Sequence, residues 1–173
     1  MLLGIISDSH DHLENLKLTL TWFRDHDVEQ IIHCGDLTHW ASLCEAWPEN
    51  YSAPIHLVAG NGDFPNEFAT LPPDAQPRLI YHGARGDLHL DQSPQGPCIA
   101  FCHTPASAKD LARSGCYSIV FYGHTHRPWI EKINSAFLIN PGNLCGRRHE
   151  ASFALYDSAT KRLDLKRLSD LTL

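Results

Sequence analysis

Residues 2–10 read LLGIISDSH, and this stretch sets a pattern that recurs along the chain. Its first part, Leu2–Ile6, has the length and apolar composition of a buried β-strand. The chain then runs directly into Asp8 and His10, two residue types that bind metal ions. In open α/β sheets, functional groups gather where the strands end. The stretch therefore predicts a strand that delivers metal ligands to one edge of a sheet.

The same arrangement follows four further apolar runs. These runs are Gln30–Cys34, Ile55–Ala59, Cys98–Cys102 and Ser118–Tyr122. The metal-binding residue types that come after them are Asp36, Asn61, His103, His124 and His126. Nearly continuous apolarity is typical of strands buried on both faces, so we expect a largely parallel sheet. Histidines with only structural roles would fall as often inside helices as after strands.

The segments between and after these runs predict the remaining elements. Apolar residues recur at helical spacing in Leu13–Arg24, and shorter helices are expected at Trp40–Trp47 and Ala106–Arg113. We expect loops over Phe64–Pro97, with strands at Arg78–Tyr81 and Asp87–Leu90, and four short antiparallel strands at Trp129–Ile133, Ala136–Asn140, Ser152–Tyr156 and Leu163–Leu168. No repeat or linker is evident, so the chain is expected to form one α/β domain over residues 1–173.

Spacing within the polar clusters bears on how their side chains converge. Asp8 and His10 are two residues apart, as are His124 and His126. In extended backbone, residues i and i+2 point the same way, so we expect each pair to face one pocket without a special turn. A glycine precedes several predicted ligands and would permit sharp turns and close backbone approach: Gly35, Gly60 and Gly123.

The ligand types favour a pair of transition-metal ions. Two Asp, one Asn and four His, without sulfur, suit Mn, Fe, Zn, Ni or Co better than Ca or Cu(I), and Mn is our first choice. Seven protein ligands exceed the needs of one ion but suit two, and a carboxylate such as Asp36 can bridge them. Two such ions activate a bridging hydroxide and clamp the oxygens of an in-line attack on phosphorus.

Taken together, the quoted clusters resemble the calcineurin-like metallophosphoesterases, in particular the small single-domain YfcE-type phosphodiesterases. The resemblance spans nearly the whole chain and implies a sandwich of two mixed β-sheets flanked by α-helices. It implies that Asp8, His10 and His126 bind one divalent ion. Asn61, His103 and His124 would bind the other, with Asp36 as the bridge. It also places the loop Asn140-Pro141-Gly142 close to the site.

Three positions depart from the family pattern. Gly62 follows Asn61, where many relatives carry a His or Cys, and the His is thought to protonate the leaving oxygen. Thr104 replaces a Gly and Asn143 replaces a Ser, and both are expected to alter the pocket wall. His39, close after Asp36, is our candidate for a substitute acid.

The bulk composition limits the partners. A net charge of −6 and the lack of a basic stripe argue against nucleic acid and favour a small phosphoester substrate. No export signal, membrane-length apolar run or CxxC pair is visible, so we expect a cytoplasmic protein with reduced thiols and no membrane contact. A phosphodiesterase is favoured. A phosphomonoesterase with the same site, a protein-binding scaffold like the retromer subunit, and a homo-oligomer stay open.

Overall fold

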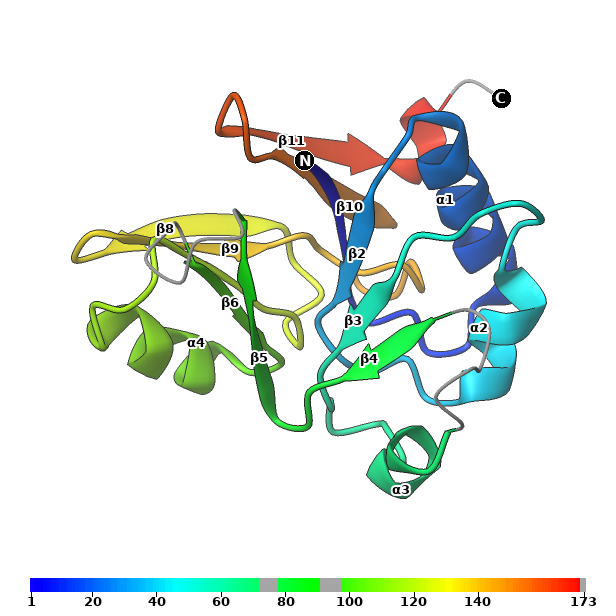
Figure 1. Ribbon diagram of the computed structural model, residues 1–173, viewed down its shortest axis with the longest axis horizontal. Helices are drawn as coiled ribbons and strands as arrows, with labels where there is room; N and C mark the ends of the chain where they lie inside the picture. Colours follow the sequence, from blue (N-terminus) through cyan, green and yellow to red (C-terminus); the bar gives the residue numbers. More distant parts are fainter. Residues whose placement is uncertain (72–77, 91–97, 172–173) are drawn as a thin grey trace.

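Two β-sheets lie face to face with helices on their outer sides (Figure 1). The computed structural model describes residues 1–71, 78–90 and 98–171. The first sheet has six strands in the order β11-β10-β1-β2-β3-β4. Their bounds are β1 (Leu2–Ile6), β2 (Gln30–His33), β3 (Ile55–Leu57), β4 (Leu79–Tyr81), β10 (Ser152–Asp157) and β11 (Arg162–Arg167). Strands β1 to β4 are parallel, β10 pairs antiparallel with β1, and β11 pairs antiparallel with β10.

The second sheet has five strands in the order β5-β6-β7-β9-β8. Their bounds are β5 (Arg85–His89), β6 (Cys98–Cys102), β7 (Ile119–Phe121), β8 (Trp129–Ile133) and β9 (Ala136–Asn140). Strands β6, β7 and β9 are parallel, and the two edge strands are antiparallel to their neighbours. Two mixed sheets are therefore confirmed. The expectation that the five apolar runs share one parallel sheet is wrong, because β6 and β7 belong to the second sheet.

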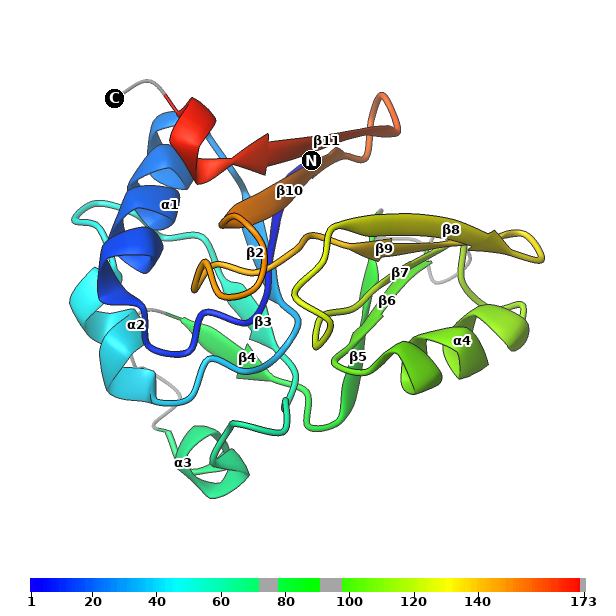
Figure 2. The ribbon, with the colours of Figure 1, turned by 180° about the vertical axis from the view of Figure 1, so that it is seen from behind.

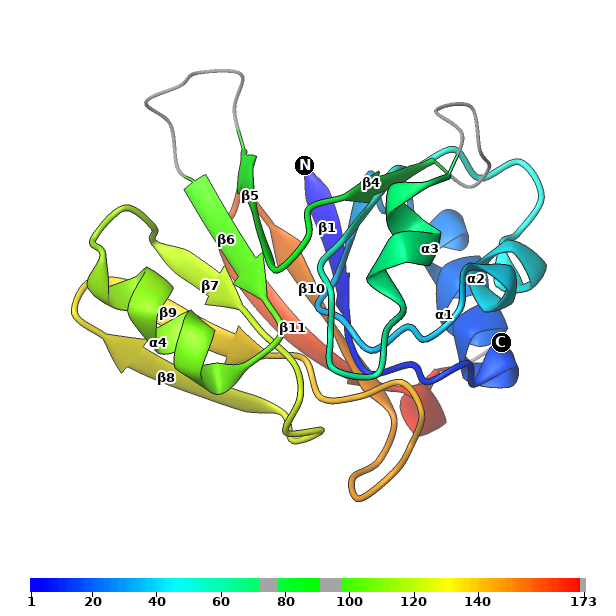
Figure 3. The same ribbon diagram turned by 90° about the horizontal axis from the view of Figure 1, so that it is seen from below.

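Helices cover the outer faces of both sheets (Figures 1 and 3). Their bounds are α1 (Leu13–Asp25), α2 (Trp40–Ala46), α3 (Pro65–Ala69), α4 (Pro105–Arg113) and the 3-10 turn η1 (Leu168–Asp170). Helix α3 corrects the prediction of loops over Phe64–Pro97. Its five residues are too few to show helical periodicity, and Pro at its first turn fixes a helical φ. Residues 72–77 and 91–97 of that stretch lie outside the described residues.

The two sheets lie between helices on either side (Figure 2). Apolar side chains alternate between three buried clusters, and this alternation holds the sheets and helices together. In β2, Ile31 packs towards α1 while Ile32 packs between the sheets. In β6, Phe101 lies between the sheets and Ala100 faces α4. Each fully buried Ile or Phe side chain contributes roughly 1.5–3 kcal/mol to the stability of the fold. The strand ends that carry the polar clusters are thus fixed on both sides.

Thr104, the residue after His103, is the N-cap of helix α4. Thr104 Oγ1 accepts a hydrogen bond from the Ser107 backbone N–H at 3.3 Å, and Pro105 occupies the first turn of α4. This is the chemistry of a helix N-cap. Thr104 therefore starts α4, which gives this departure from the family pattern a structural purpose.

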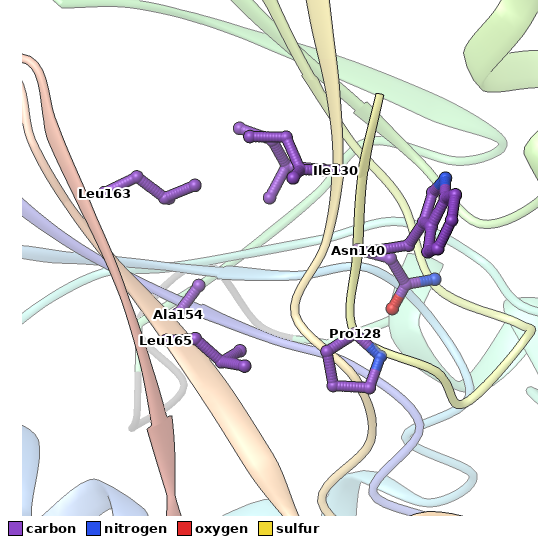
Figure 4. Close-up of a pocket in the computed structure, with 8 residues that line it drawn as sticks. Pro128, Ile130, Asn140, Ala154, Leu163 and Leu165 are labelled. Carbon is purple, nitrogen blue, oxygen red and sulfur yellow. The ribbon is translucent and has the colours of Figure 1, made fainter. Parts of the chain in front are cut away.

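An apolar pocket of about 300 Å³ lies between the second sheet and strands β10 and β11 (Figure 4). It is lined by Pro128, Trp129, Ile130, Ile139, Asn140, Ala154, Leu163 and Leu165. None of the seven predicted metal ligands lines it. In the described part of the chain, every helix is too short or too polar to cross a membrane.

Two neutral histidines stabilise the contact between the sheets. The ring of His56 in β3 is buried and donates from Nε2 to Gln30 Oε1 at 3.0 Å. Its Nδ1 therefore accepts from His82 Nε2 at 2.9 Å. Burial lowers the pKa of His56 to about 4, and the nearby His82 and Arg78 add to the shift because they disfavour a further positive charge. Protonation of His56 would place two N–H groups against each other.

We expect His56 to make the fold sensitive to acid. An unfolded histidine titrates near 6.5, so the unfolded chain binds more protons between pH 6.5 and 4, and stability falls as the pH falls through that window. Between pH 7 and 5, the free energy of unfolding should fall by about 1–2 kcal/mol less in the variant His56→Gln than in wild type. Urea unfolding at several pH values measures this difference. An unchanged pH slope in the variant would contradict the assignment.

Candidate metal centre

The seven predicted ligands meet where the carboxyl ends of strands from both sheets come together. Asp8 and His10 follow β1, Asp36 follows β2, and Asn61 follows β3. His103 follows β6, and the pair His124 and His126 follows β7. Asp8, Asp36 and His103 are buried, whereas Asn61 and His124 are exposed. The cluster therefore has a buried floor and a side that solvent can reach.

The backbone at these residues is left-handed rather than extended. Asp8 has φ 52°, His10 has φ 43°, His124 has φ 69° and His126 has φ 61°. Asp36 joins them at φ 57°. The expectation that extended backbone aims each i, i+2 pair is therefore wrong, and tight left-handed turns do so instead. Non-glycine residues in this region are uncommon, and such strain is often found at functional sites.

Glycines let the clusters approach each other closely. A Cβ at Gly60 would lie 2.1 Å from Asp36 Oδ1, and a Cβ at Gly123 would lie 1.9 Å from Ser7 Oγ. No side chain fits at either position without moving a predicted ligand or its support. The expected role of glycine in close backbone approach is therefore correct at these two positions.

One half of the cluster gathers around Asp8 and Asp36. His126 Nε2 lies 3.4 Å from Asp8 Oδ1, and His10 Nε2 lies 3.6 Å from Asp36 Oδ2. The rings of His10 and His126 stack with centroids 5.3 Å apart. These four side chains are the ones that the family resemblance assigns to the first ion and the bridge.

The other half gathers around His103. Its Nε2 lies 3.0 Å from Asn61 Oδ1, 3.5 Å from Asp36 Oδ2 and 3.2 Å from His124 Nδ1. His124 Nδ1 is also 2.8 Å from Asn61 Oδ1. Asp36 thus contacts both halves through one carboxylate, which is the position a bridging ligand requires.

Two features show that this donor set fits cations. Asp8 is fully buried, yet its Oδ1 has no hydrogen-bond partner. His103 Nδ1 donates to the Cys34 carbonyl at 2.8 Å, so in the neutral ring Nε2 is an acceptor that faces the acceptor Asn61 Oδ1. A buried carboxylate oxygen without a hydrogen-bond partner is unfavourable unless a positive charge lies beside it. Two facing acceptors are unfavourable unless a positive charge lies between them.

The carboxylates have opposite pKa shifts. Burial raises the pKa of Asp8, although the Ser7 hydroxyl donates to it and opposes the shift. Burial also acts to raise the pKa of Asp36, but His103 and the Gly62 N–H outweigh it and lower the pKa to about 2. Burial lowers the pKa of His103, and the nearby Asp36 more than compensates, so the net shift is upward. Asp36 is therefore anionic throughout the neutral range.

Asp63 fixes the turns that carry the ligands. Its Oδ2 accepts from the backbone N–H of Asp36 at 2.9 Å and of Gly60 at 2.7 Å. Its Oδ1 accepts from the Thr38 N–H at 2.7 Å. The carboxylate thereby ties the turn after β2 to the turn after β3. Such supporting contacts orient metal ligands.

Sequence reasoning missed Cys145 as a neighbour of the centre. Its Sγ lies 3.8 Å from His126 Nδ1, and the atoms of His10, His126 and Cys145 lie close enough to share an ion. Asn143 holds this side of the site, because its Nδ2 donates to the His126 carbonyl and its Oδ1 accepts from the Arg147 N–H. No spacing signal in the sequence links Cys145 to a residue 19 positions away.

The structure pairs His39 with Asp11, which directly follows the predicted ligand His10 in the chain. His39 Nδ1 is 2.7 Å from Asp11 Oδ2, and its ring centroid is 5.1 Å from that of Phe64. The hydrogen bond to Asp11 raises the pKa of His39. At Gly62, a Cβ would lie 3.3 Å from Asp36 Oδ1, so the backbone nearly admits a side chain there. The role of His39 as an acid stays a prediction.

Residues 1–161 match the model of the calcineurin-like phosphoesterase superfamily domain. The chain belongs to this superfamily. Its members are metal-dependent, and the clusters just described are candidate sites for the metal. The sequence-based resemblance to the small metallophosphoesterases is thereby confirmed. The chain is accordingly a member of a phosphoesterase family.

Individual relatives support the same branch of the superfamily. The chain is 30% identical over 163 residues to phosphodiesterase MJ0936 of Methanocaldococcus jannaschii, covering 84% of this chain and 86% of that protein. A solved structure described as a novel archaeal phosphodiesterase has a TM-score of 0.80 at 30% identity, covering 96% of this chain and 99% of that one. Yfce, a phosphoesterase from E. coli, shares the fold with a TM-score of 0.66 at 18% identity, covering 97% and 100% of the chains.

We predict that Asp8→Asn changes stability in opposite directions without and with metal. In chelator-treated protein the variant should melt about 2–6 °C higher than wild type, because a neutral amide replaces a buried carboxylate whose Oδ1 has no hydrogen-bond partner. With excess Mn²⁺, wild type should gain several degrees and the variant much less. Differential scanning calorimetry with and without Mn²⁺ measures both shifts.

The exposed Asp27→Asn serves as the matched control, since it removes the same charge away from the cluster. It should respond to Mn²⁺ as wild type does. A lower melting temperature of metal-free Asp8→Asn, together with an undiminished response to Mn²⁺, would contradict this reading of Asp8.

Proposed function

We propose that the chain is a dimetal-dependent phosphoester hydrolase, and specifically a phosphodiesterase that acts on small substrates. The observation that carries the proposal is the convergence of seven ligand-type side chains at the strand ends. One of them, Asp8, has a buried carboxylate oxygen without a hydrogen-bond partner. The similarity to a protein named as a phosphodiesterase supports the choice of diesters.

In this proposal the two halves of the cluster each hold one divalent ion, Mn²⁺ being the first choice. Asp8, His10 and His126 would hold one, Asn61, His103 and His124 would hold the other, and Asp36 would be shared by both. When bound, the two ions supply Lewis acidity that lowers the pKa of water and stabilises charge on phosphate oxygens. The carboxylates of Asp8 and Asp36 offset only part of four positive charges, so the site attracts an anionic ester.

The protein's own residues set the geometry of the reaction. His103 is locked by the Cys34 carbonyl, so its Nε2 points to the centre. Exposed Asn61 and His124 lie on the side from which a substrate can enter. Since position 62 is glycine, the proton for the leaving oxygen must come from elsewhere, and His39 paired with Asp11 is our candidate.

The net charge of −6 supports a small substrate rather than nucleic acid. None of the six cysteines, all within the described residues, forms a disulfide bond, which supports a reducing compartment such as the cytoplasm.

We predict metal-dependent turnover of bis-p-nitrophenyl phosphate. Chelator-treated protein should be inactive and should recover with Mn²⁺, and Asn61→Ala or His124→Ala should lose at least about 100-fold in kcat/KM, because each removes a ligand. Asn66→Ala and His26→Ala, which change exposed residues of the same types elsewhere, should keep wild-type rates.

Parallel assays with p-nitrophenyl phosphate decide between diester and monoester preference. A higher kcat/KM for the diester supports a phosphodiesterase, and the reverse supports a phosphomonoesterase. If Mn²⁺-loaded wild type turns over neither ester nor any of a wider panel, the enzyme proposal fails and a protein-binding scaffold becomes the better account.

We further predict that His39→Ala impairs hydrolysis most when the leaving group is poor. The loss of rate for a phenyl ester should exceed that for the p-nitrophenyl ester by roughly tenfold, because only the poorer leaving group needs a proton. An acid is active while protonated, so kcat should fall as pH rises through the raised pKa of His39. Asp11→Asn should move this fall to lower pH. Equal losses for both leaving groups would argue against His39 as the acid.

A further inference from the structure

A second cluster of ligand-type side chains lies on the outer strand pair of the second sheet. Strand β5 is an edge strand and pairs antiparallel with β6, with His89 opposite Cys98 and Asp87 opposite Ala100. Leu88 packs towards the core between the sheets, so Asp87 and His89 lie on the opposite face. Figure 3 shows β5 and β6 at the edge of the sheet that α4 covers. The cluster is separate from the candidate metal centre at the strand ends.

Three atoms of this cluster form a nearly equilateral triangle. Cys98 Sγ lies 3.9 Å from Asp87 Oδ2 and 3.9 Å from His89 Nε2. His89 Nε2 lies 3.9 Å from the same Asp87 Oδ2. The centre of such a triangle is about 2.3 Å from each corner, which is close to the Zn–S distance of about 2.3 Å and slightly longer than Zn–N and Zn–O distances. A contraction of a few tenths of an ångström would complete a zinc site.

The contacts within the triangle are too long to account for its shape. A distance of 3.9 Å between nitrogen and oxygen is no hydrogen bond, and 3.9 Å is at the outer limit for a thiol. The three polar groups thus converge with only long contacts between them. The side chains of Asp87 and His89 are 54% and 44% exposed, so an ion and a completing water have access from solvent.

The donor types select the ion. A thiol, an imidazole and a carboxylate together suit Zn²⁺ or Co²⁺, whereas Mg²⁺ and Ca²⁺ prefer oxygen alone. Burial and the neighbouring Asp87 raise the pKa of the Cys98 thiol, so without metal the sulfur keeps its proton. Binding of Zn²⁺ would form a Zn–S bond and release that proton to solvent.

We propose that Asp87, His89 and Cys98 form a zinc site that cross-links the end of β5 to the start of β6. His89 is the last residue of β5 and Cys98 is the first of β6, so one ion would fix the point where the chain leaves and rejoins the sheet. The assignment is independent of the reaction at the candidate metal centre.

The test is the binding of Zn²⁺ and Co²⁺ to the full chain after removal of metal by a chelator. In equilibrium dialysis, wild type should retain one equivalent of Zn²⁺ more than Cys98→Ser. Co²⁺-loaded wild type should show a sulfur-to-cobalt charge-transfer band in the near ultraviolet. This band should vanish in Cys98→Ser and persist in Cys44→Ala, which removes a thiol from α2.

Asp87→Asn is the second variant, because Asp87 is half exposed and its substitution should leave the fold intact. It should weaken binding of the extra equivalent roughly tenfold or more. Hydrolysis of bis-p-nitrophenyl phosphate should be unaffected in both variants. Equal Zn²⁺ retention by wild type and Cys98→Ser would overturn the proposal, as would a charge-transfer band that survives in Cys98→Ser and therefore comes from Cys145.

Discussion

The arrangement of the strand ends is governed by one electrostatic constraint: two aspartates and several imidazoles share a small, partly buried volume. Asp8 Oδ1 is buried without a hydrogen bond, and His103 presents an acceptor to Asn61. Such a set is unfavourable by itself and becomes favourable around cations. The supporting contacts agree with this reading. Ser7 donates to Asp8, and the Cys34 carbonyl holds His103, so the donors are aimed before any ion arrives.

Packing in the apolar layers offsets the unfavourable free energy of this arrangement, because it fixes both sheets on either side of the strand ends. Left-handed backbone at Asp8, His10, Asp36, His124 and His126 is unfavourable at each residue. A rigid scaffold can sustain such conformations where a mobile loop would relax out of them. Asp63 contributes by tying the turns after β2 and β3 through three backbone N–H groups. The same rigidity gives the reacting groups fixed positions, which is the main requirement for positioning a phosphoester.

The sequence predicted the strands, the larger helices and the residues that gather at the site, because buried strands and their polar ends leave a local signal. It did not predict how the strands divide between two sheets, since apolar runs in β3 and β6 look alike whichever sheet they join. The left-handed turns at Asp8 and His124 were missed because no local rule requires them of those residues. Cys145 and the triangle of Asp87, His89 and Cys98 depend on contacts across the fold and follow no metal-binding spacing.

Electron paramagnetic resonance of the Mn²⁺-loaded protein tests the central claim most directly, because it reports whether two ions share a ligand. If Asp36 bridges two ions in one centre, the spectrum should show the multiline signal of a spin-coupled manganese pair, and Asp36→Asn should abolish it. The signal of isolated Mn²⁺ ions at full loading of active wild-type protein would contradict a dimetal centre built on these strand ends.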